Sequence, residues 1–69
     1  MDQATKKRIQ GAIAYMSEGE LHDYQETCNQ ALKTMRENDL EYLDDIHKRD
    51  WEEMYAMLSF ALLKFLQMH

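Results

Sequence analysis

The stretch MYAMLSFALLKFL, residues Met54–Leu66, decides the fold. Eleven of its thirteen residues are apolar, and only Ser59 and Lys64 interrupt them. The apolar side chains recur at intervals of three and four and also fill the positions in between, so a helix over this stretch is apolar on every side. A helix of this kind is normally surrounded by other protein. The sequence therefore predicts a last helix that needs neighbours all around it.

The composition of the rest of the chain also favours helices. The 69 residues include no Pro, no Val and only two Gly, whereas Leu, Met, Ala, Glu and Lys are frequent. These frequent side chains lose little conformational freedom in a helix. We therefore expect a single all-α domain over residues 1–69, folded as a small bundle of three helices.

Two similar corners divide the chain into these helices. MSEGEL, residues 16–21, is echoed by MRENDL, residues 35–40. In each segment an apolar stripe ends at the Met. Gly19 or Asn38 follows, and both residue types tolerate the left-handed backbone conformation found just after a helix. The acid that follows favours the start of a new helix.

The corners place the first helix at about residues 3–17 and the second at about residues 20–37. The third begins near residue 39 or 40 and is long. Basic side chains before Asp50, and an Asp50–Glu53 pair that resembles a capping box, leave two options at residues 47–50. The third helix is either continuous or broken there into two.

The last helix is more apolar than two neighbours can cover. The first two predicted helices each carry one apolar stripe, enough for about half of its circumference. The uncovered part predicts a non-enzymatic regulator, adaptor or inhibitor that binds a protein partner or a second copy of itself as a homodimer. The expected contact residues are Trp51, Met54, Tyr55, Met57, Leu58, Phe60, Leu62, Leu63, Phe65 and Leu66, with Met68 as a further candidate.

The net charge of −5 is unevenly distributed, and this supports an alternative function. Residues 17–47 contain nine acids and only two basic residues. Carboxylates along a helix can imitate the charge array of DNA, as in small phage-encoded anti-host proteins, and occupy the basic groove of a nucleic-acid-binding protein. The candidate acidic residues are Glu37, Asp39, Glu41, Asp44 and Asp45.

Motifs for catalysis or metal binding are weak. The spacings of Asp44 with His47 and of His22 with Glu26 suit a helix face, but no second matching pair completes a carboxylate metal site. Cys28 falls within the apolar stripe of the second helix, so we interpret it as a core residue and not as a nucleophile. We therefore expect no enzymatic activity, no metal and no cofactor.

The sequence also argues against several environments and partners. The negative net charge disfavours direct binding of nucleic acid, and the basic cluster at residues 6–8 is interpreted as a solvated helix surface. Neither a signal peptide nor an apolar stretch of about 18 residues is present, which argues against secretion and membrane insertion. A single Cys cannot form an internal disulfide framework, so the expected location is the cytoplasm.

Overall fold

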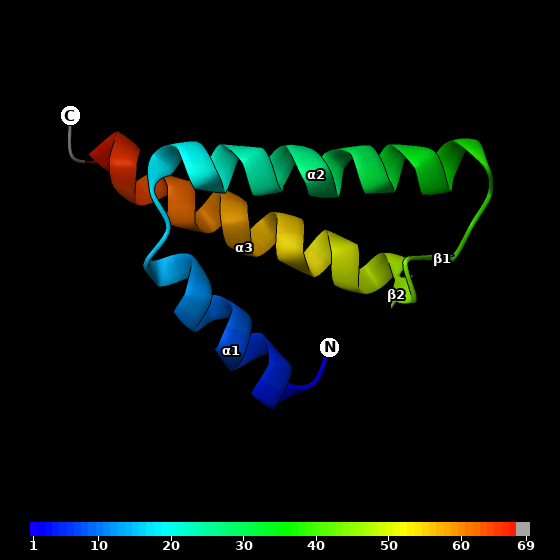
Figure 1. Ribbon diagram of the computed structural model, residues 1–69, viewed down its shortest axis with the longest axis horizontal. Helices are drawn as coiled ribbons and strands as arrows, with labels where there is room; N and C mark the ends of the chain where they lie inside the picture. The colour runs from blue at the N-terminus through cyan, green and yellow to red at the C-terminus, as the bar shows by residue number, and fades with distance from the viewer. Residues whose placement is uncertain (68–69) are drawn as a thin grey trace.

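The computed structural model describes residues 1–67 and confirms the all-α class, with three helices and a long third one (Figure 1). Met68, a candidate contact residue, lies outside the described residues. The elements are α1 (Gln3–Ala14), α2 (Glu18–Glu37), the two-residue strands β1 (Tyr42–Leu43) and β2 (Ile46–His47), and α3 (Lys48–Gln67).

The corner between α1 and α2 is built by Ser17 and not by Gly19. The Ser17 hydroxyl accepts a hydrogen bond from the backbone N–H of Glu20, whose carboxylate accepts one from the backbone N–H of Ser17. This reciprocal capping box starts α2 at Glu18, two residues earlier than predicted. Gly19 consequently lies inside the first turn of α2 with a negative φ, so its predicted role after a helix is wrong.

The third helix starts at Lys48, at the predicted break, and the residues before it form a hairpin instead of helix. The chain leaves α2 through Asp39, which takes the left-handed conformation (φ 53°) that we had assigned to Asn38. Asp44 and Asp45 then make the turn of the hairpin, both with positive φ, as in a type I′ turn. The sequence lacked the Asn-Gly or Asp-Gly pair that usually marks such a turn, so the hairpin was not predicted.

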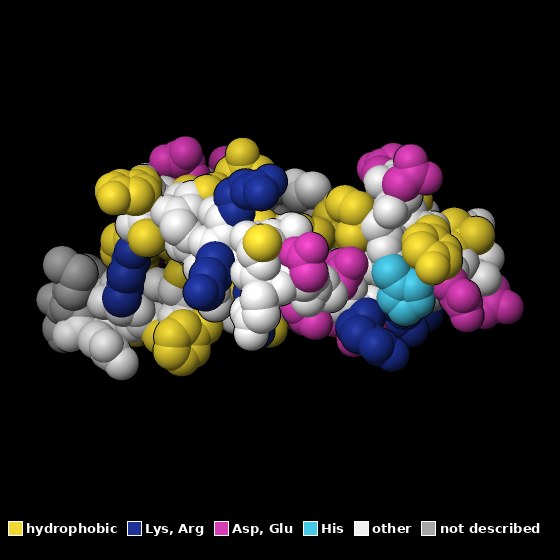
Figure 2. Space-filling view, turned by 90° about the horizontal axis from the view of Figure 1, so that it is seen from below, with side chains coloured by type: hydrophobic (Ala, Val, Ile, Leu, Met, Phe, Trp, Pro, Cys, Tyr) yellow, Lys and Arg dark blue, Asp and Glu magenta, His cyan; other side chains and the backbone are white. Residues whose placement is uncertain are grey.

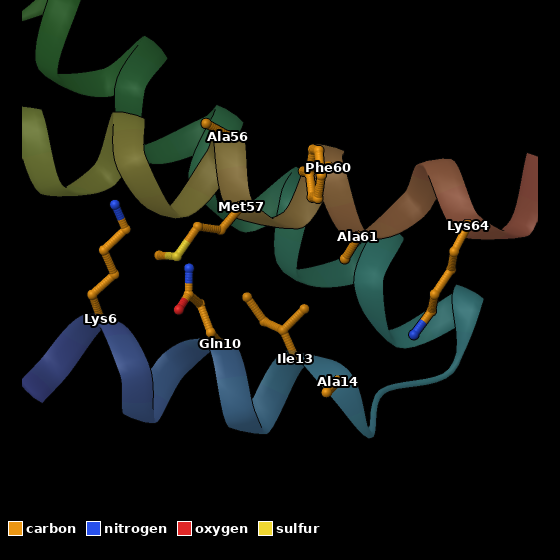
Figure 3. A pocket seen from close by; sticks show the side chains of 9 residues that line it. All are labelled: Lys6, Gln10, Ile13, Ala14, Ala56, Met57, Phe60, Ala61 and Lys64. Atoms are coloured by element: carbon orange, nitrogen blue, oxygen red, sulfur yellow. The ribbon is translucent and has the colours of Figure 1, made fainter. Parts of the chain in front are cut away.

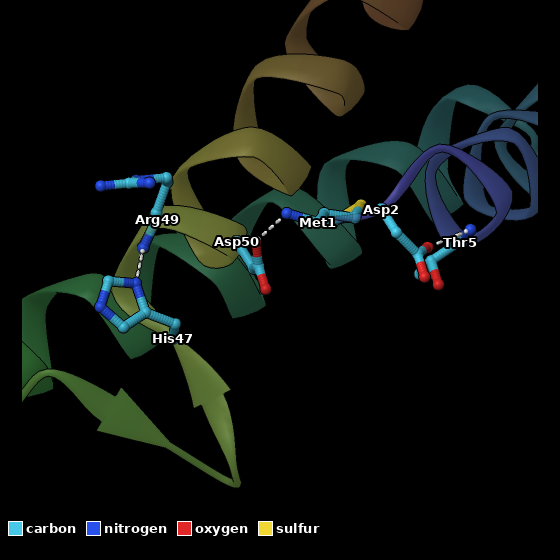
Figure 4. Close-up of polar contacts among 6 residues, drawn as sticks. All are labelled: Met1, Asp2, Thr5, His47, Arg49 and Asp50. Atoms are coloured by element: carbon cyan, nitrogen blue, oxygen red, sulfur yellow. Dashed lines mark hydrogen bonds and ion pairs between the residues drawn. The ribbon is translucent and has the colours of Figure 1, made fainter.

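The start of α3 also differs from the predicted cap. The Nδ1 atom of His47 accepts a hydrogen bond of 3.0 Å from the backbone N–H of Arg49, which makes His47 the capping residue (Figure 4). Asp50, the predicted cap, instead accepts a 2.8 Å hydrogen bond from the N-terminal amine of Met1. This ion pair holds the beginning of α1 against the beginning of α3.

The core lies between α2 and α3, which run antiparallel and make the most extensive contact in the molecule. It is completed by one side chain from α1. Tyr24 and Ala12 fall on the apolar stripes of α2 and α1 by their spacing in the sequence, but both are exposed. The buried residues are Ile13, Leu21, Cys28, Ala31, Met35, Trp51 and Leu58.

The three helices lie side by side, with α3 between α2 and α1, and α1 diverges from the other two (Figure 1). The molecule consequently measures 40 Å by 26 Å by only 14 Å. Its radius of gyration is 12.7 Å, whereas a compact chain of this length has about 11 Å. Seen edge-on, hydrophobic side chains appear at both the upper and the lower margin of this flat shape (Figure 2).

Candidate functional site

The ten predicted contact residues of the last helix divide into three groups by exposure. Trp51 and Leu58 are buried in the core of the chain and therefore offer no surface to a partner. Four others pack partly against that core: Met54, Met57, Leu62 and Phe65. The remaining four are exposed: Tyr55, Phe60, Leu63 and Leu66.

Trp51 is buried because the hairpin folds over the first turns of α3. Its indole N–H donates a hydrogen bond of 3.1 Å to the backbone carbonyl of Leu43 in β1. Because the only polar atom of the ring is satisfied, the rest of the ring can pack among apolar neighbours without a desolvation penalty. The hairpin therefore covers a part of α3 that we expected from the sequence to be exposed to a partner.

The exposed apolar residues of α3 form one continuous surface. At 100° per residue, they fall on a single arc of the helix together with the exposed Ala56. We define the outer face of α3 as Tyr55, Ala56, Phe60, Leu63 and Leu66. Phe60 is 77% exposed and Leu66 is 71% exposed, which is unusual for side chains of this size in a core-forming helix. Sequence reasoning missed Ala56, although its spacing of four from Phe60 places it on this arc.

A groove of about 590 Å³ between α1 and α3 adjoins the outer face (Figure 3). Ala56 and Phe60 belong to both surfaces, and Ile13 projects from α1 toward α3 at the base of the groove. Its walls are mainly apolar, with Lys6 and Lys64 toward opposite ends. The groove exists because α1 diverges from α3 and leaves a strip of α3 without neighbours.

A second, more apolar groove of about 360 Å³ lies where α1, α2 and the start of α3 meet. Cys28 of α2 and Leu58 of α3 line it, and Ile9 and Ile13 line it from α1. Burial raises the pKa of the Cys28 thiol, because the thiolate would be poorly solvated there. A raised pKa disfavours a nucleophilic thiolate, and the 4% exposure of Cys28 agrees with our interpretation of it as a core residue.

The five predicted acidic residues are all exposed and lie around the hairpin, at the end of the molecule away from Leu66 (Figure 1). Three of them, Asp39, Asp44 and Asp45, have the positive φ angles that end α2 and turn the hairpin. No ion pair joins any of the five to a basic side chain within residues 1–67. These carboxylates therefore combine a role in the backbone turns with a solvated negative surface.

The two histidines within residues 1–67 have local structural contacts. The His47 ring caps α3 and packs edge-on against Tyr42, with 5.0 Å between the ring centres. His22 lies 3.9 Å from Glu18, one turn earlier in α2. Within residues 1–67, no three His, Cys, Asp or Glu side chains are grouped as a metal site would require.

No helix in the described part of the chain is both long and apolar enough to cross a bilayer. No protein-family model matches the sequence, and no curated protein or solved structure is significantly similar to it. The functional interpretation therefore depends on the residues and geometry of this chain.

Proposed function

We propose that this chain is a non-enzymatic binding protein, a regulator, adaptor or inhibitor, whose contact surface is the outer face of α3. The supporting observation is the exposure of Phe60 and Leu66, at 77% and 71%, beside an apolar groove. Exposed aromatic side chains such as Phe60 are enriched at the centres of protein interfaces. The reduced, buried Cys28 suits action in the cytoplasm.

Burial of the outer face supplies the free energy for this binding. Moving a Phe or Leu side chain from water into a well-packed contact is worth about 1.5–3 kcal/mol. Phe60, Leu63 and Leu66 combine a large side chain with at least 46% exposure, so each can contribute on this scale. The gain has to offset the entropy lost on association. Because the gain is hydrophobic, we expect binding to persist or strengthen at high salt.

A second candidate function uses the acidic surface around the hairpin. The observation that favours it is the exposure of all five carboxylates without ion pairing within residues 1–67. A basic groove of a nucleic-acid-binding protein would be the complementary partner. Lys48 and Arg49 follow directly in α3 and reduce the negative charge there. This interaction would weaken steeply as salt is added, in contrast to docking of the outer face.

Site-specific photo-crosslinking distinguishes these functions. A photoreactive phenylalanine analogue is placed at Phe60, at Glu41 in the acidic surface, or at the exposed Lys33 of α2 as a control. We expect adducts with a polypeptide from position 60 that persist in 1 M salt, and none above background from position 33. Adducts from position 41 alone that disappear in salt would favour the acidic surface. Equal yields from positions 60 and 33 would contradict the proposed function.

A further inference from the structure

We propose that the polypeptide bound by the outer face of α3 is a second copy of this chain. In this dimer the two α3 helices pack antiparallel through this face, and the two-fold axis crosses the face at the level of Phe60. The inference rests on the proposed function, because it uses the same surface and names its occupant. Three observations carry it: the surface area of the single chain, its flat shape, and the order of charges along α3.

The single chain exposes more surface than a compact protein of its size. Its accessible area is 5272 Å², whereas the relation for folded monomers predicts about 4600 Å² at 8.3 kDa. The difference, about 700 Å², is close to the roughly 800 Å² that each partner buries in a standard interface. Pairing of two copies would therefore bring the exposed area per chain near the usual value.

The shape favours pairing across a broad side of the molecule. The chain is 14 Å in its shortest dimension and 40 Å in its longest. Two copies stacked along the short axis would be closer to equal in all dimensions, which is the form that minimises exposed surface. Hydrophobic side chains at the margins of the edge-on view provide apolar contacts for this stacking (Figure 2).

The residues around Phe60 match those of an antiparallel copy in size. Ala56 precedes Phe60 by four residues and Lys64 follows it by four, so each lies about 6 Å along the helix axis from it. With the axis at the level of Phe60, the small Ala56 comes opposite the turn that holds Leu63 of the partner subunit. An exposed Ala beside an exposed Phe leaves room for a Leu to enter.

The charges on α3 favour the antiparallel arrangement over the parallel one. Glu53 and Gln67 lie seven residues on either side of Phe60. In the antiparallel pair, Glu53 faces the turn that carries Lys64 and Gln67 of the partner subunit, and Glu53 and Lys64 lie on the same flank of the helix. In a parallel pair in register, Glu53 and Lys64 of the partner subunit would instead lie eleven residues apart along the helix axis, about 16 Å, so this ion pair would be lost.

The first test is the solution mass of the 69-residue chain, measured by sedimentation over a range of concentrations. We expect a dimer, with a mass twice the 8.3 kDa of the chain. Phe60→Asp and Leu63→Asp should each raise the dissociation constant at least 100-fold while helicity is retained, because both side chains are exposed in the single chain. Tyr15→Asp is the matched control, since Tyr15 is 92% exposed but lies outside α3, and it should leave the mass unchanged.

The second test fixes the orientation of the pair. Lys64→Glu should weaken the dimer about tenfold at low salt, and the double variant Glu53→Lys/Lys64→Glu should restore it. Lys33→Glu changes the net charge equally on the exposed surface of α2 and should have no effect. Failure of the double variant to restore a dimer weakened by Lys64→Glu would overturn the antiparallel register.

The two proposals can fail separately. A monomer at high concentration whose position 60 crosslinks to a foreign polypeptide would overturn the dimer and retain the proposed function. A monomer without crosslinks from position 60 would overturn both. A dimer that withstands Phe60→Asp and Leu63→Asp would show that the outer face of α3 is not its interface.

Discussion

The two halves of α3 differ in composition and in burial, and the half with more charged residues is the more deeply buried one. Residues 48–58 include charged side chains at five positions, yet this half contains both buried residues of the helix, Trp51 and Leu58. Residues 59–67 contain a single charge, Lys64, yet none of them is fully buried. The more apolar half of α3 is therefore the less covered one. How deeply a segment is buried depends on which other elements pack against it, and not on its own composition alone. An apolar segment that the rest of its chain leaves uncovered is a candidate interface.

Polar contacts explain why the first half is covered. The Met1 amine bonds to Asp50, the Trp51 indole bonds to the hairpin carbonyl of Leu43, and the backbone N–H of Lys48 bonds to the carbonyl of Glu41 at 2.8 Å. These contacts fasten the N-terminus and the hairpin to one end of α3. The single described side-chain hydrogen bond to the second half joins Gln25 of α2 to Ser59, at 2.7 Å.

The largest expected effect compares the same substitution in the two halves. Leu58→Ala should lower the free energy of unfolding by about 3 kcal/mol, because it leaves a cavity in the core. Leu63→Ala should cost about 1 kcal/mol or less in the monomer, since Leu63 is 46% exposed. Urea denaturation at the lowest usable protein concentration measures both values. Equal losses would mean that the second half is as well packed as the first.

A smaller effect is expected at the turn of the hairpin. Asp44 and Asp45 both have positive φ, a conformation in which Asn at the first position and Gly at the second are more favourable. The double variant Asp44→Asn/Asp45→Gly should stabilise the chain by about 1 kcal/mol, measured by thermal denaturation. A loss of stability would mean that the two carboxylates stabilise the folded chain by more than the positive φ angles destabilise it.

The ion pair between Met1 and Asp50 should control how tightly α1 is held. Asp50→Asn removes the charge that faces the amine. We expect faster reaction of Cys28 with a thiol reagent, because α1 lines the groove in which this buried thiol lies. Asp23→Asn, on the exposed surface of α2, is the control and should react as the unchanged chain does. Equal rates for the two variants would contradict a fastening role.

The same ion pair predicts a pH dependence. The hydrogen bond to Asp50 raises the pKa of the Met1 amine above its ordinary value of 8.0. A raised folded-state pKa means that the stabilisation is fully present below pH 8.0 and is lost as the pH rises through the folded-state value. The difference in stability between the unchanged chain and Asp50→Asn should therefore shrink above pH 8.0. Thermal denaturation from pH 7 to 10 measures this difference, and a constant difference would contradict the assignment.

Much of the fold was predictable from local patterns. The absence of Pro and the helix-forming side chains predicted the all-α class, and the apolar stripe of the second helix predicted the core position of Cys28. The structure also ends α2 at Glu37, the position that the sequence predicted. The start of α2 was missed although its signal, Ser17 followed by Glu20, was present as a capping-box sequence.

The candidate surface was only partly predictable. Eleven apolar residues among thirteen indicate that the last helix exceeds the cover of two neighbours, but periodicity cannot select which side stays open when every side is apolar. That selection required the hairpin over Trp51 and the divergence of α1 beside Phe60. Both depend on contacts between residues far apart in the sequence.

The sequence by itself determined that this chain forms helices, where its polar corners lie, and that its last helix carries surplus apolar surface. These properties arise from side-chain entropy, capping and helical periodicity, which act over a few neighbouring residues. Only the tertiary structure decided that the surplus lies at Phe60, Leu63 and Leu66. Which side of an apolar helix is covered depends on the packing of distant elements, and here the Met1–Asp50 and Trp51–Leu43 contacts bring those elements to the other half of α3.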